Sequence, residues 1–383
     1  MNAPTNRPGA EKRPLVTVAI PAYNAALTLG HTLDSVLTQT YPHIEIIVVD
    51  DGSTDSTPDV LRAYGDRVRS VRLPHCGLPK ARNTGCSIAR GALIALMDAD
   101  DICMPERIEV QVEALETYPD AVLCSSDFAA FDRNGPVAES YGARYYSMIR
   151  DAPRGLGSFY TESCRIEVAV DAPSGPRELI GVDIRTGSIY RELAFGNFVH
   201  PPTVLFHRRA LEAVGMFDES LPFNCDWECF VRMSRSGPFV HVDRPLIAYR
   251  LSESQMSSSR GNGAASAVEL VQAAKKVWEA DPELLARESA RIRRHRAEFY
   301  LSAAYALAER RKTHAARMLA GSIWCGMLKA TTFVTAIKLV LPQVLVLAVR
   351  HMRSRVMGLA LCAPHLVDDW LLACPEVFAR CLN

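Results

Sequence analysis

The sequence feature that most constrains the fold is an unbroken apolar run that ends in carboxylates. Residues 92–97 read ALIALM, and Asp98, Asp100 and Asp101 follow directly. A short apolar run bounded by polar residues is typical of a β-strand that is buried on both faces. The run therefore predicts a central strand with Asp98 and Asp100 at its carboxyl end.

The spacing of the two aspartates suggests a metal site. Asp98 and Asp100 are two residues apart, so in an extended strand their side chains point the same way. Paired carboxylate oxygens suit Mg²⁺ or Mn²⁺ that holds a substrate phosphate. Acidic residues after a strand also act as turn formers or helix caps, so this stretch alone leaves both interpretations open.

The first 130 residues alternate strand and helix patterns. Apolar strand patterns, with helix patterns between most of them, occur at 15–20, 44–49, 68–73, 92–97 and 121–125. Strands that alternate with helices predict right-handed crossovers and a parallel sheet. Ligands of such sheets bind outside the carboxyl ends of the strands. The most polar strand ends are residues 21–24, 50–55 and 98–101, and we expect them to converge on one crevice.

Beyond residue 130 the pattern changes twice. Residues 131–199 are rich in Gly, Pro, Arg and aromatic residues, and we expect a loop-rich insertion beside the sheet, where acceptor specificity can lie. Regular pattern returns at 203–206, and two closing strands are expected at 239–242 and 246–249. A Ser/Gly-rich linker begins at residue 257, and helices are expected from there to residue 383.

Composition and charge exclude several classes of protein. Lys+Arg and Asp+Glu are both 43, so nothing points to a nucleic-acid partner and we expect none. The eleven cysteines form no CxxC pair, which indicates neither a zinc site nor a disulfide framework and favours the cytoplasm. Residues 1–14 lack the apolar core of a signal peptide and are expected to form a disordered leader.

The most apolar tract, residues 331–349, lies near the length limit of a membrane span. It contains Lys338 and Pro342, and a basic segment follows it at once, with Arg350, His351, Arg353 and Arg355. Three interpretations stay open. The tract forms a buried or amphipathic helix pair, it attaches the protein peripherally to anionic lipid on the inner face of the membrane, or it spans the membrane.

Four motifs together resemble a known family. They occur in order along the chain as VAIPAYN (18–24), VVDDGSTD (48–55), ARNTG (81–85) and MDADD (97–101). In this arrangement the sequence is similar to family 2 glycosyltransferases, over residues 15–130 and, with fewer matches, 200–252. The resemblance implies an α/β fold of the GT-A class for residues 15–256: a Rossmann-like, mostly parallel sheet flanked by helices. An all-helical C-terminal region, 257–383, is expected after it.

The resemblance implies a donor site. Pro21 and Tyr23 match the motif that frames the nucleotide base, and Tyr23 would stack on the base. Asp51 matches the carboxylate that accepts a hydrogen bond from a uracil-like N–H group, which favours a UDP-sugar. Arg82 matches a position near the nucleotide, with a solvated helix arginine as the alternative, and Asp98 would face the ribose.

The resemblance also implies a metal ligand and a base. Asp100 would bind Mn²⁺ or Mg²⁺ at the diphosphate. Asp226 matches the catalytic carboxylate, although Cys225 stands where the family commonly has Glu, and an N-cap role for Asp226 remains the alternative. His200 and Trp227 are the candidate contacts to the acceptor.

The function that the resemblance implies is inverting transfer of a sugar, as in hexosyltransferases. The donor would be a nucleoside-diphosphate sugar, and the acceptor a hydroxyl of a glycan or lipid-linked molecule in surface polysaccharide or glycoconjugate synthesis. Two alternatives stay open. A metal-dependent nucleotidyltransferase uses a similar sheet, although no Gly-rich basic loop follows the first strand. A non-catalytic binding protein would keep the fold without the activity.

Overall fold

The structure is a computed structural model that describes residues 13–170, 177–252, 263–308, 311–327 and 330–340. Almost all of the expected leader lies outside the described residues. So do most of the Ser/Gly-rich linker, residues 341–349 of the apolar tract, and the basic segment after that tract. The chain divides into two compact units, Met1–His295 and Arg296–Asn383.

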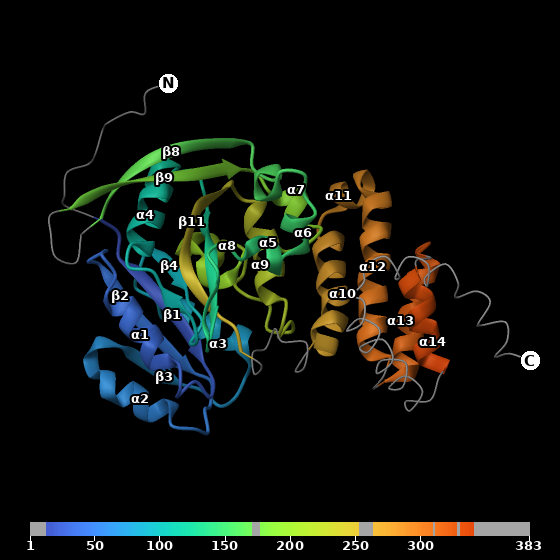
Figure 1. The fold of residues 1–383 in the computed structure, drawn as a ribbon, viewed down its shortest axis with the longest axis horizontal. Coiled ribbons are helices and arrows are strands. Elements are labelled where there is room, and N and C mark those ends of the chain that lie inside the picture. The colour runs from blue at the N-terminus through green and yellow to red at the C-terminus, as the bar shows by residue number, and fades with distance from the viewer. Residues whose placement is uncertain (1–12, 171–176, 253–262, 309–310, 328–329, 341–383) are drawn as a thin grey trace, which may run out of the picture. The chain divides into compact units, whose positions relative to one another are not determined.

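The first unit is built around a mixed, mostly parallel sheet (Figure 1). Its strands are β1 (Val16–Ala22), β2 (Ile44–Asp50), β3 (Arg69–Arg72), β4 (Leu93–Leu96), β5 (Ile102–Cys103), β6 (Leu123–Asp132), β7 (Gly135–Ala138), β8 (Glu162–Val170), β9 (Glu178–Gly187), β10 (Leu205–His207) and β11 (Phe239–Arg250). The strand order is β3-β2-β1-β4-β10-β6-β11-β9-β8, with β5 beside β11 and β7 beside β6. Along this path only β9 and β10 run against the other strands. The fold class expected from the sequence is confirmed.

Helices cover the sheet on both faces because its strands are apolar on both faces. Ile46 and Val48 of β2 belong to the core that includes α1 (Leu29–Leu37), α2 (Thr57–Tyr64) and α4 (Arg107–Thr117). The alternate residues, Ile47 and Val49, pack with Ala81 of α3 (Leu78–Ser87) on the opposite face. All four residues of β4 are buried, so the strand expected from the ALIALM run lies in the centre of the sheet.

The segment expected to be loop-rich contains a long hairpin. The strands β8 and β9 pair along their whole length and extend the sheet beside β11. The expectation missed them because one face carries charged residues, while the apolar face supplies Val168, Val182 and Ile184 to the main core. The short helices of this segment are α5 (Gly142–Tyr145), α6 (Ser147–Arg150), a 3₁₀ turn (Gly155–Ser158) and α7 (Tyr190–Leu193).

The two expected closing strands are one irregular strand. The pairing of β11 with β6 shifts register between Val242 and Pro245 and again between Pro245 and Ile247. Proline has no N–H to donate to a neighbouring strand, which explains the irregularity at this point. Before β11 come a 3₁₀ turn (Pro201–Thr203), α8 (Arg208–Ala213), which Gly215 terminates with a φ of +85°, and α9 (Cys225–Ser234). A further 3₁₀ turn (Gly65–Arg67) precedes β3.

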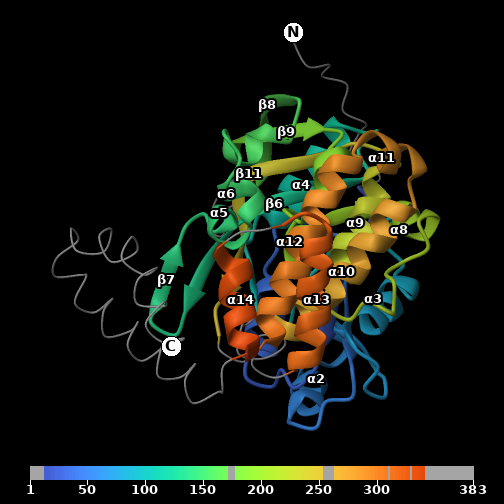
Figure 2. The ribbon, with the colours of Figure 1, turned by 90° about the vertical axis from the view of Figure 1, so that its right-hand side faces the viewer.

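The first unit extends past the sheet through two more helices, α10 (Gly263–Glu279) and α11 (Pro282–Arg287). Figures 1 and 2 show α10 beside α9. Trp278 of α10 is buried, and its Nε1 donates a hydrogen bond to the carbonyl oxygen of Ala194 at 2.8 Å. Residues 263–295 therefore fold with the sheet.

The described part of the second unit consists of helices. It contains most of α12 (Ser289–Leu307), then α13 (Lys312–Trp324) and α14 (Ala330–Val340). Leu301 and Leu319 share a small core, and Ser322 Oγ donates to the carbonyl oxygen of Ala297 at 2.9 Å. The helices α12 and α13 thus pack together, and helices are present where the sequence predicted them. Across the part of the chain that the structure describes, no helix has both the length and the apolarity that crossing a bilayer requires.

Candidate functional site

The polar ends of three neighbouring parallel strands lie at one edge of the sheet. β1 pairs with β2 on one side and with β4 on the other, so residues that follow these strands meet. Asn24 Oδ1 accepts a hydrogen bond from the Thr54 backbone N at 2.8 Å, and the Asn24 backbone N donates to Ser53 Oγ at 2.9 Å. The three strand ends therefore lie at one edge of the sheet, as expected.

Tyr23 and Asp51 flank the turn before α3. Tyr23 is about half exposed (47%), and its ring stacks on His75 with the centroids 4.1 Å apart and an angle of 24° between planes. Asp51 is buried. Its Oδ1 accepts from the Cys76 backbone N at 2.8 Å, and its Oδ2 lies 2.9 Å from the Gly77 backbone N and 3.0 Å from His75 Nδ1.

Asp50 and Gly52 shape the turn that carries Asp51. Buried Asp50 accepts from the Ser53 backbone N at 2.8 Å and from Arg72 Nη1 at 2.9 Å, so it orders the turn and is not presented to a ligand. Pro21 lies in β1 near the same edge of the sheet and is partly exposed.

Replacing Gly52 with Ala tests how tightly this turn is packed. Gly52 has a φ of +77°, and an added Cβ would lie 2.7 Å from the His75 backbone N. Because strain of this kind costs about 1–3 kcal/mol and the collision adds to it, we expect Gly52→Ala to lower the free energy of unfolding by about 3 kcal/mol. Urea denaturation measures it. Gly65→Ala is the control, because Gly65 also has a positive φ (+54°) but no atom within 4 Å of an added Cβ. Equal losses in the two variants would contradict the close approach.

Arg82 of α3 joins the end of β4 to the start of α9. Its side chain is buried, with Nη2 3.3 Å from Asp98 Oδ1 and Nη1 4.0 Å from Cys225 Sγ. Burial disfavours the charged form of Arg82, but the charges of Asp98, Cys225 and Asp226 outweigh burial and raise its pKa. The alternative, that Arg82 is a solvated helix arginine, is therefore wrong. Arg82 places a permanent positive charge near the carboxylates of Asp98 and Asp226.

Asp226 occupies the first turn of α9 and is partly exposed, while the N-cap position belongs to Asn224. Burial raises the pKa of the Asp226 carboxyl, the charge of Arg82 opposes the rise, and the charge of Asp98 adds to it. Burial also raises the pKa of the Cys225 thiol to about 12. A carboxylate with a raised pKa is a better proton acceptor than an ordinary aspartate, whereas the neutral thiol is not a base.

The aspartates after β4 differ in their surroundings. The Asp98 side chain is one-third exposed, and Asp100 is partly exposed with its carbonyl oxygen accepting from Arg250 Nε at 2.7 Å. Asp101 is buried: its Oδ1 accepts from the Arg250 backbone N at 2.9 Å, and its carbonyl oxygen accepts from Thr32 Oγ1 at 2.8 Å. Asp101 therefore holds β11 and α1 against the strand end, and Asp98 and Asp100 are the ones that reach solvent.

The acidic strand end fits a cation that arrives with a phosphate. Among the described residues no group of three or more His, Cys, Asp or Glu side chains has the arrangement of a metal site. Mg²⁺ needs no such cage, because it keeps several water ligands and binds through one or two carboxylates and substrate phosphates. Asp98 and Asp100 offer that minimal set of hard oxygen ligands.

Aromatic rings gather near the carboxylates of Asp98 and Asp226, in a group that we call the aromatic group: Phe128, Tyr145, Tyr146, His200 and Tyr249. The His200 ring stacks on Phe128 at 4.0 Å and meets Tyr249 edge-on at 5.0 Å. Its Nδ1 lies 3.2 Å from the Tyr146 hydroxyl. Burial, followed by the charge of Arg82, lowers the pKa of His200 to about 3, so His200 is neutral.

Tyr146 connects the aromatic group to the carboxylates. Burial raises its pKa well above the usual value, and the charges of Tyr145 and Asp226 add to the rise. The Tyr146 hydroxyl therefore keeps its proton and lies within the electrostatic reach of Asp226. His200 is 5% exposed, so its ring packs inside the aromatic group and is hardly accessible to solvent.

Trp227 does not lie where the sequence suggested. It is 1% exposed, and its Nε1 donates to the carbonyl oxygen of Leu193 at 2.7 Å. The expected contact between Trp227 and an acceptor is wrong, because one step along a helix turns a side chain to another face. The neighbour of Asp226 thus faces the core.

The sequence analysis missed two residues at this edge of the sheet. His75 lies against Tyr23 and Asp51, and its only signal was an aromatic side chain shortly after the third strand. Glu269 of α10 is buried, and its Oε1 accepts from the backbone N of Phe223 at 2.9 Å and of Asn224 at 2.7 Å. Glu269 therefore fixes the segment that leads into Asp226, although it lies in the region assigned to the helical tail.

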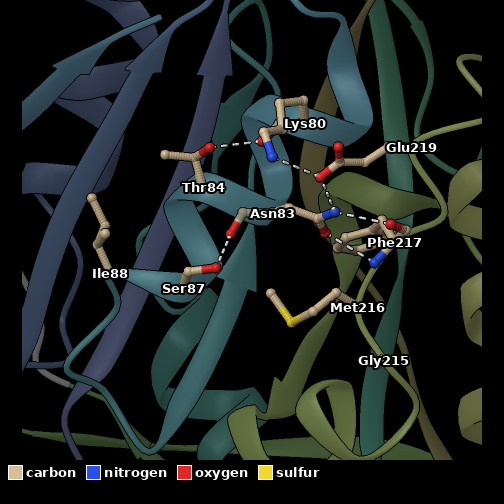
Figure 3. Close-up of a pocket in the computed structure, with 9 residues that line it drawn as sticks. All are labelled: Lys80, Asn83, Thr84, Ser87, Ile88, Gly215, Met216, Phe217 and Glu219. Carbon is tan, nitrogen blue, oxygen red and sulfur yellow. Dashed lines mark hydrogen bonds and ion pairs between the residues drawn. The ribbon is translucent and has the colours of Figure 1, made fainter.

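A pocket on the far face of α3 is separate from these groups (Figure 3). It has a volume of about 540 Å³ and is lined by Lys80, Asn83, Thr84, Ser87, Ile88, Gly215, Met216, Phe217 and Glu219. Lys80 Nζ lies 3.2 Å from Glu219 Oε1. Arg82 lies on another face of the helix, so the pocket contains none of the predicted donor or acceptor residues.

The proteins to which this chain is similar are glycosyltransferases. A sequence model described as glycosyl transferase family 2 matches residues 17–167. An uncharacterised glycosyltransferase of Rickettsia prowazekii is 28% identical over 249 residues, which cover 65% of this chain and 68% of the relative. The glycosyltransferase YibD of Escherichia coli K12, also uncharacterised, is 37% identical over 129 residues, which cover 33% of this chain and 37% of the relative.

Some of the similar proteins are longer than this chain. The chain spans about a third (36%) of the length of an uncharacterised glycosyltransferase of Rickettsia felis, at 28% identity. The crystal structure of S. aureus TarS shares the fold, with a TM-score of 0.50 and 17% identity over 82% of this chain and 49% of TarS. Residues 17–167 therefore form a domain of the glycosyl transferase family 2 type.

Proposed function

We propose that the protein is an inverting glycosyltransferase that moves a sugar from a nucleoside-diphosphate donor to a hydroxyl group. The observation that carries the proposal is the position of Arg82, whose buried guanidinium bonds Asp98 and lies beside the start of α9. This contact brings the acidic end of β4 and Asp226 to one place at the sheet edge. In this proposal the site would combine a nucleotide-binding edge, a cation site and a base.

The donor would lie across the ends of β1, β2 and β4. Tyr23 and Pro21 would frame the base, Asp51 would accept a hydrogen bond from it, and Asp98 would face the ribose. Uracil has an N–H between two carbonyl groups, which suits a carboxylate, so UDP is the favoured nucleotide. Arg82 would compensate negative charge near the diphosphate.

The chemical step would be direct displacement at the anomeric carbon. Asp226 would remove the proton of the acceptor hydroxyl as its oxygen forms a bond to that carbon, while the bond from the carbon to the phosphate oxygen breaks. Attack from the face opposite the leaving group inverts the anomeric centre. General base catalysis of this kind contributes on the order of 10²–10⁴-fold in rate.

Asp100, with Asp98 beside it, would hold Mg²⁺ or Mn²⁺ when the donor binds. The ion would supply Lewis-acid stabilisation of the negative charge that develops on the leaving diphosphate. The acceptor would lie on the side of the aromatic group, where Tyr145 is 37% exposed and can pack against a sugar ring. We propose a glycan or a lipid-linked acceptor, as in surface polysaccharide or glycoconjugate synthesis.

We propose that the protein is located in the cytoplasm. Residues 331–356 remain the proposed route to peripheral membrane contact. Sedimentation with anionic vesicles at low salt tests that contact, and protein that stays in the supernatant would contradict it.

A screen for nucleotide release tests the proposed function. The full chain is incubated with UDP-sugars and GDP-sugars, each with and without Mn²⁺, and free UDP or GDP is measured. We expect slow nucleotide release from one class of donor, and this release should depend on Mn²⁺. The release should be lost in Asp100→Ala. It should be kept in the control Asp120→Ala, since Asp120 is exposed on the surface. If no donor releases its nucleotide, the result would contradict the transferase and favour a binding protein. Release of pyrophosphate from nucleoside triphosphates would favour a nucleotidyltransferase.

A further inference from the structure

The imidazole of His75 makes the two contacts that the proposed function gives to the nucleobase. It stacks on Tyr23 with centroids 4.1 Å apart, and its Nδ1 lies 3.0 Å from Asp51 Oδ2. The same Nδ1 lies 3.1 Å from the Asp51 carbonyl oxygen. Both oxygens are acceptors, so Nδ1 carries the hydrogen. His75 therefore presents a flat ring to Tyr23 and an N–H to Asp51, as a uracil ring would.

We propose that His75 competes with the nucleobase of the donor for Tyr23 and Asp51, and so sets the affinity for the donor. The inference rests on the proposed function, because Tyr23 and Asp51 are the base contacts there. A carboxylate has about four positions that accept hydrogen bonds, and Cys76 N, Gly77 N and His75 Nδ1 take three of them. Departure of the imidazole frees one acceptor position together with the stacking face of Tyr23.

The surroundings of His75 let the side chain leave without moving the backbone. The His75 side chain is 58% exposed, whereas that of Asp51 is 5% exposed. Asp51 keeps its bonds to the backbone N–H groups of Cys76 and Gly77 when the imidazole turns away. The turn is also held by the close approach of Gly52 to the His75 backbone. The imidazole thus moves alone, as a side chain on a fixed turn.

Competition of this kind has a defined signature. If the site is available only when His75 has turned away, the apparent dissociation constant is the intrinsic one divided by the fraction of open sites. That fraction belongs to the free protein, so removal of His75 improves the binding of any nucleotide that uses the site by the same factor. A stacked aromatic pair with a hydrogen bond is worth enough to change affinity by about three- to tenfold.

Calorimetric titration of the full chain with UDP and with GDP, in the presence of Mn²⁺, tests the inference. We expect His75→Ala to bind both nucleotides about three- to tenfold more tightly than the wild type. His75→Phe keeps a ring for Tyr23 but cannot donate to Asp51, so its affinity should lie between the two. His43→Ala is the matched control, because His43 is also exposed and packs against a tyrosine, Tyr41, with centroids 6.3 Å apart.

The outcomes separate the inference from the proposed function. Unchanged or weaker binding in both His75 variants, with the wild type binding UDP or GDP, would overturn the competition and leave the transferase intact. If His75→Ala binds both nucleotides more tightly by one common factor, the result supports the competition. Absence of binding in the wild type and in every variant would overturn the inference and the proposed donor site together.

Discussion

Asp226→Asn should lower the rate of sugar transfer by about 10³-fold while donor affinity stays within about twofold of the wild type. The amide has the shape of the carboxylate but cannot take the proton of the acceptor, and general base catalysis contributes about 10²–10⁴-fold. The structure supports this assignment because burial raises the pKa of Asp226 and Arg82 holds the site together. The measurement is kcat for transfer, with titration of the donor in parallel.

The pH profile of the same reaction checks the identity of the base. If Asp226 is the base, it acts only when it is deprotonated, so activity should fall as the pH falls through its pKa. Because that pKa is raised, the acid limb should lie above pH of about 4, the value for an ordinary aspartate. Asp120→Asn is the control for the amide, since Asp120 is exposed and precedes β6, at the end of the strand away from the carboxyl ends. A near wild-type rate in Asp226→Asn would show that another group is the base.

Arg82→Met should lower the free energy of unfolding by about 3 kcal/mol and abolish measurable donor binding. Removal of one partner from a buried ion pair costs about 3–5 kcal/mol, and the lower end applies because Asp98 is one-third exposed. The loss of the guanidinium charge also leaves Asp98 and Asp226 without a compensating positive charge. Urea denaturation and donor titration measure the two effects.

Arg82→Lys is the matched control because it keeps the charge but loses the planar fork that reaches both Asp98 and Cys225. We expect it to retain most of the stability and to bind the donor weakly. Wild-type stability and donor affinity in Arg82→Met would contradict the role of Arg82 as the bridge between β4 and α9.

The strand ends could be predicted from sequence because their signal is local. An apolar run that ends in Asp98 and Asp100, and a β-branched run that ends in Asp50, each place a polar cluster at a strand terminus. Parallel strands bring such termini to one edge of a sheet. Residues that are close in sequence form this part of the site, so a short sequence pattern is sufficient to predict it.

The rest of the site depends on contacts between distant segments. Glu269 reaches back to the backbone of Phe223 and Asn224, a contact that no local pattern indicates. Trp227 follows Asp226 directly, yet helix geometry turns it into the core. The hairpin of β8 and β9 was missed because its alternation of apolar residues lies among Arg and Glu. Burial and pairing decide these positions, and both are properties of the folded chain.

The most direct test of the central claim is a crystal structure of the full chain with UDP and Mn²⁺. The account predicts the uracil against Tyr23 and Asp51, with the His75 imidazole turned away. It predicts the ribose at Asp98, and the diphosphate and the ion at Asp100, on the side that faces Asp226. UDP bound elsewhere on the protein, with Tyr23, Asp100 and Asp226 all out of contact, would contradict the account.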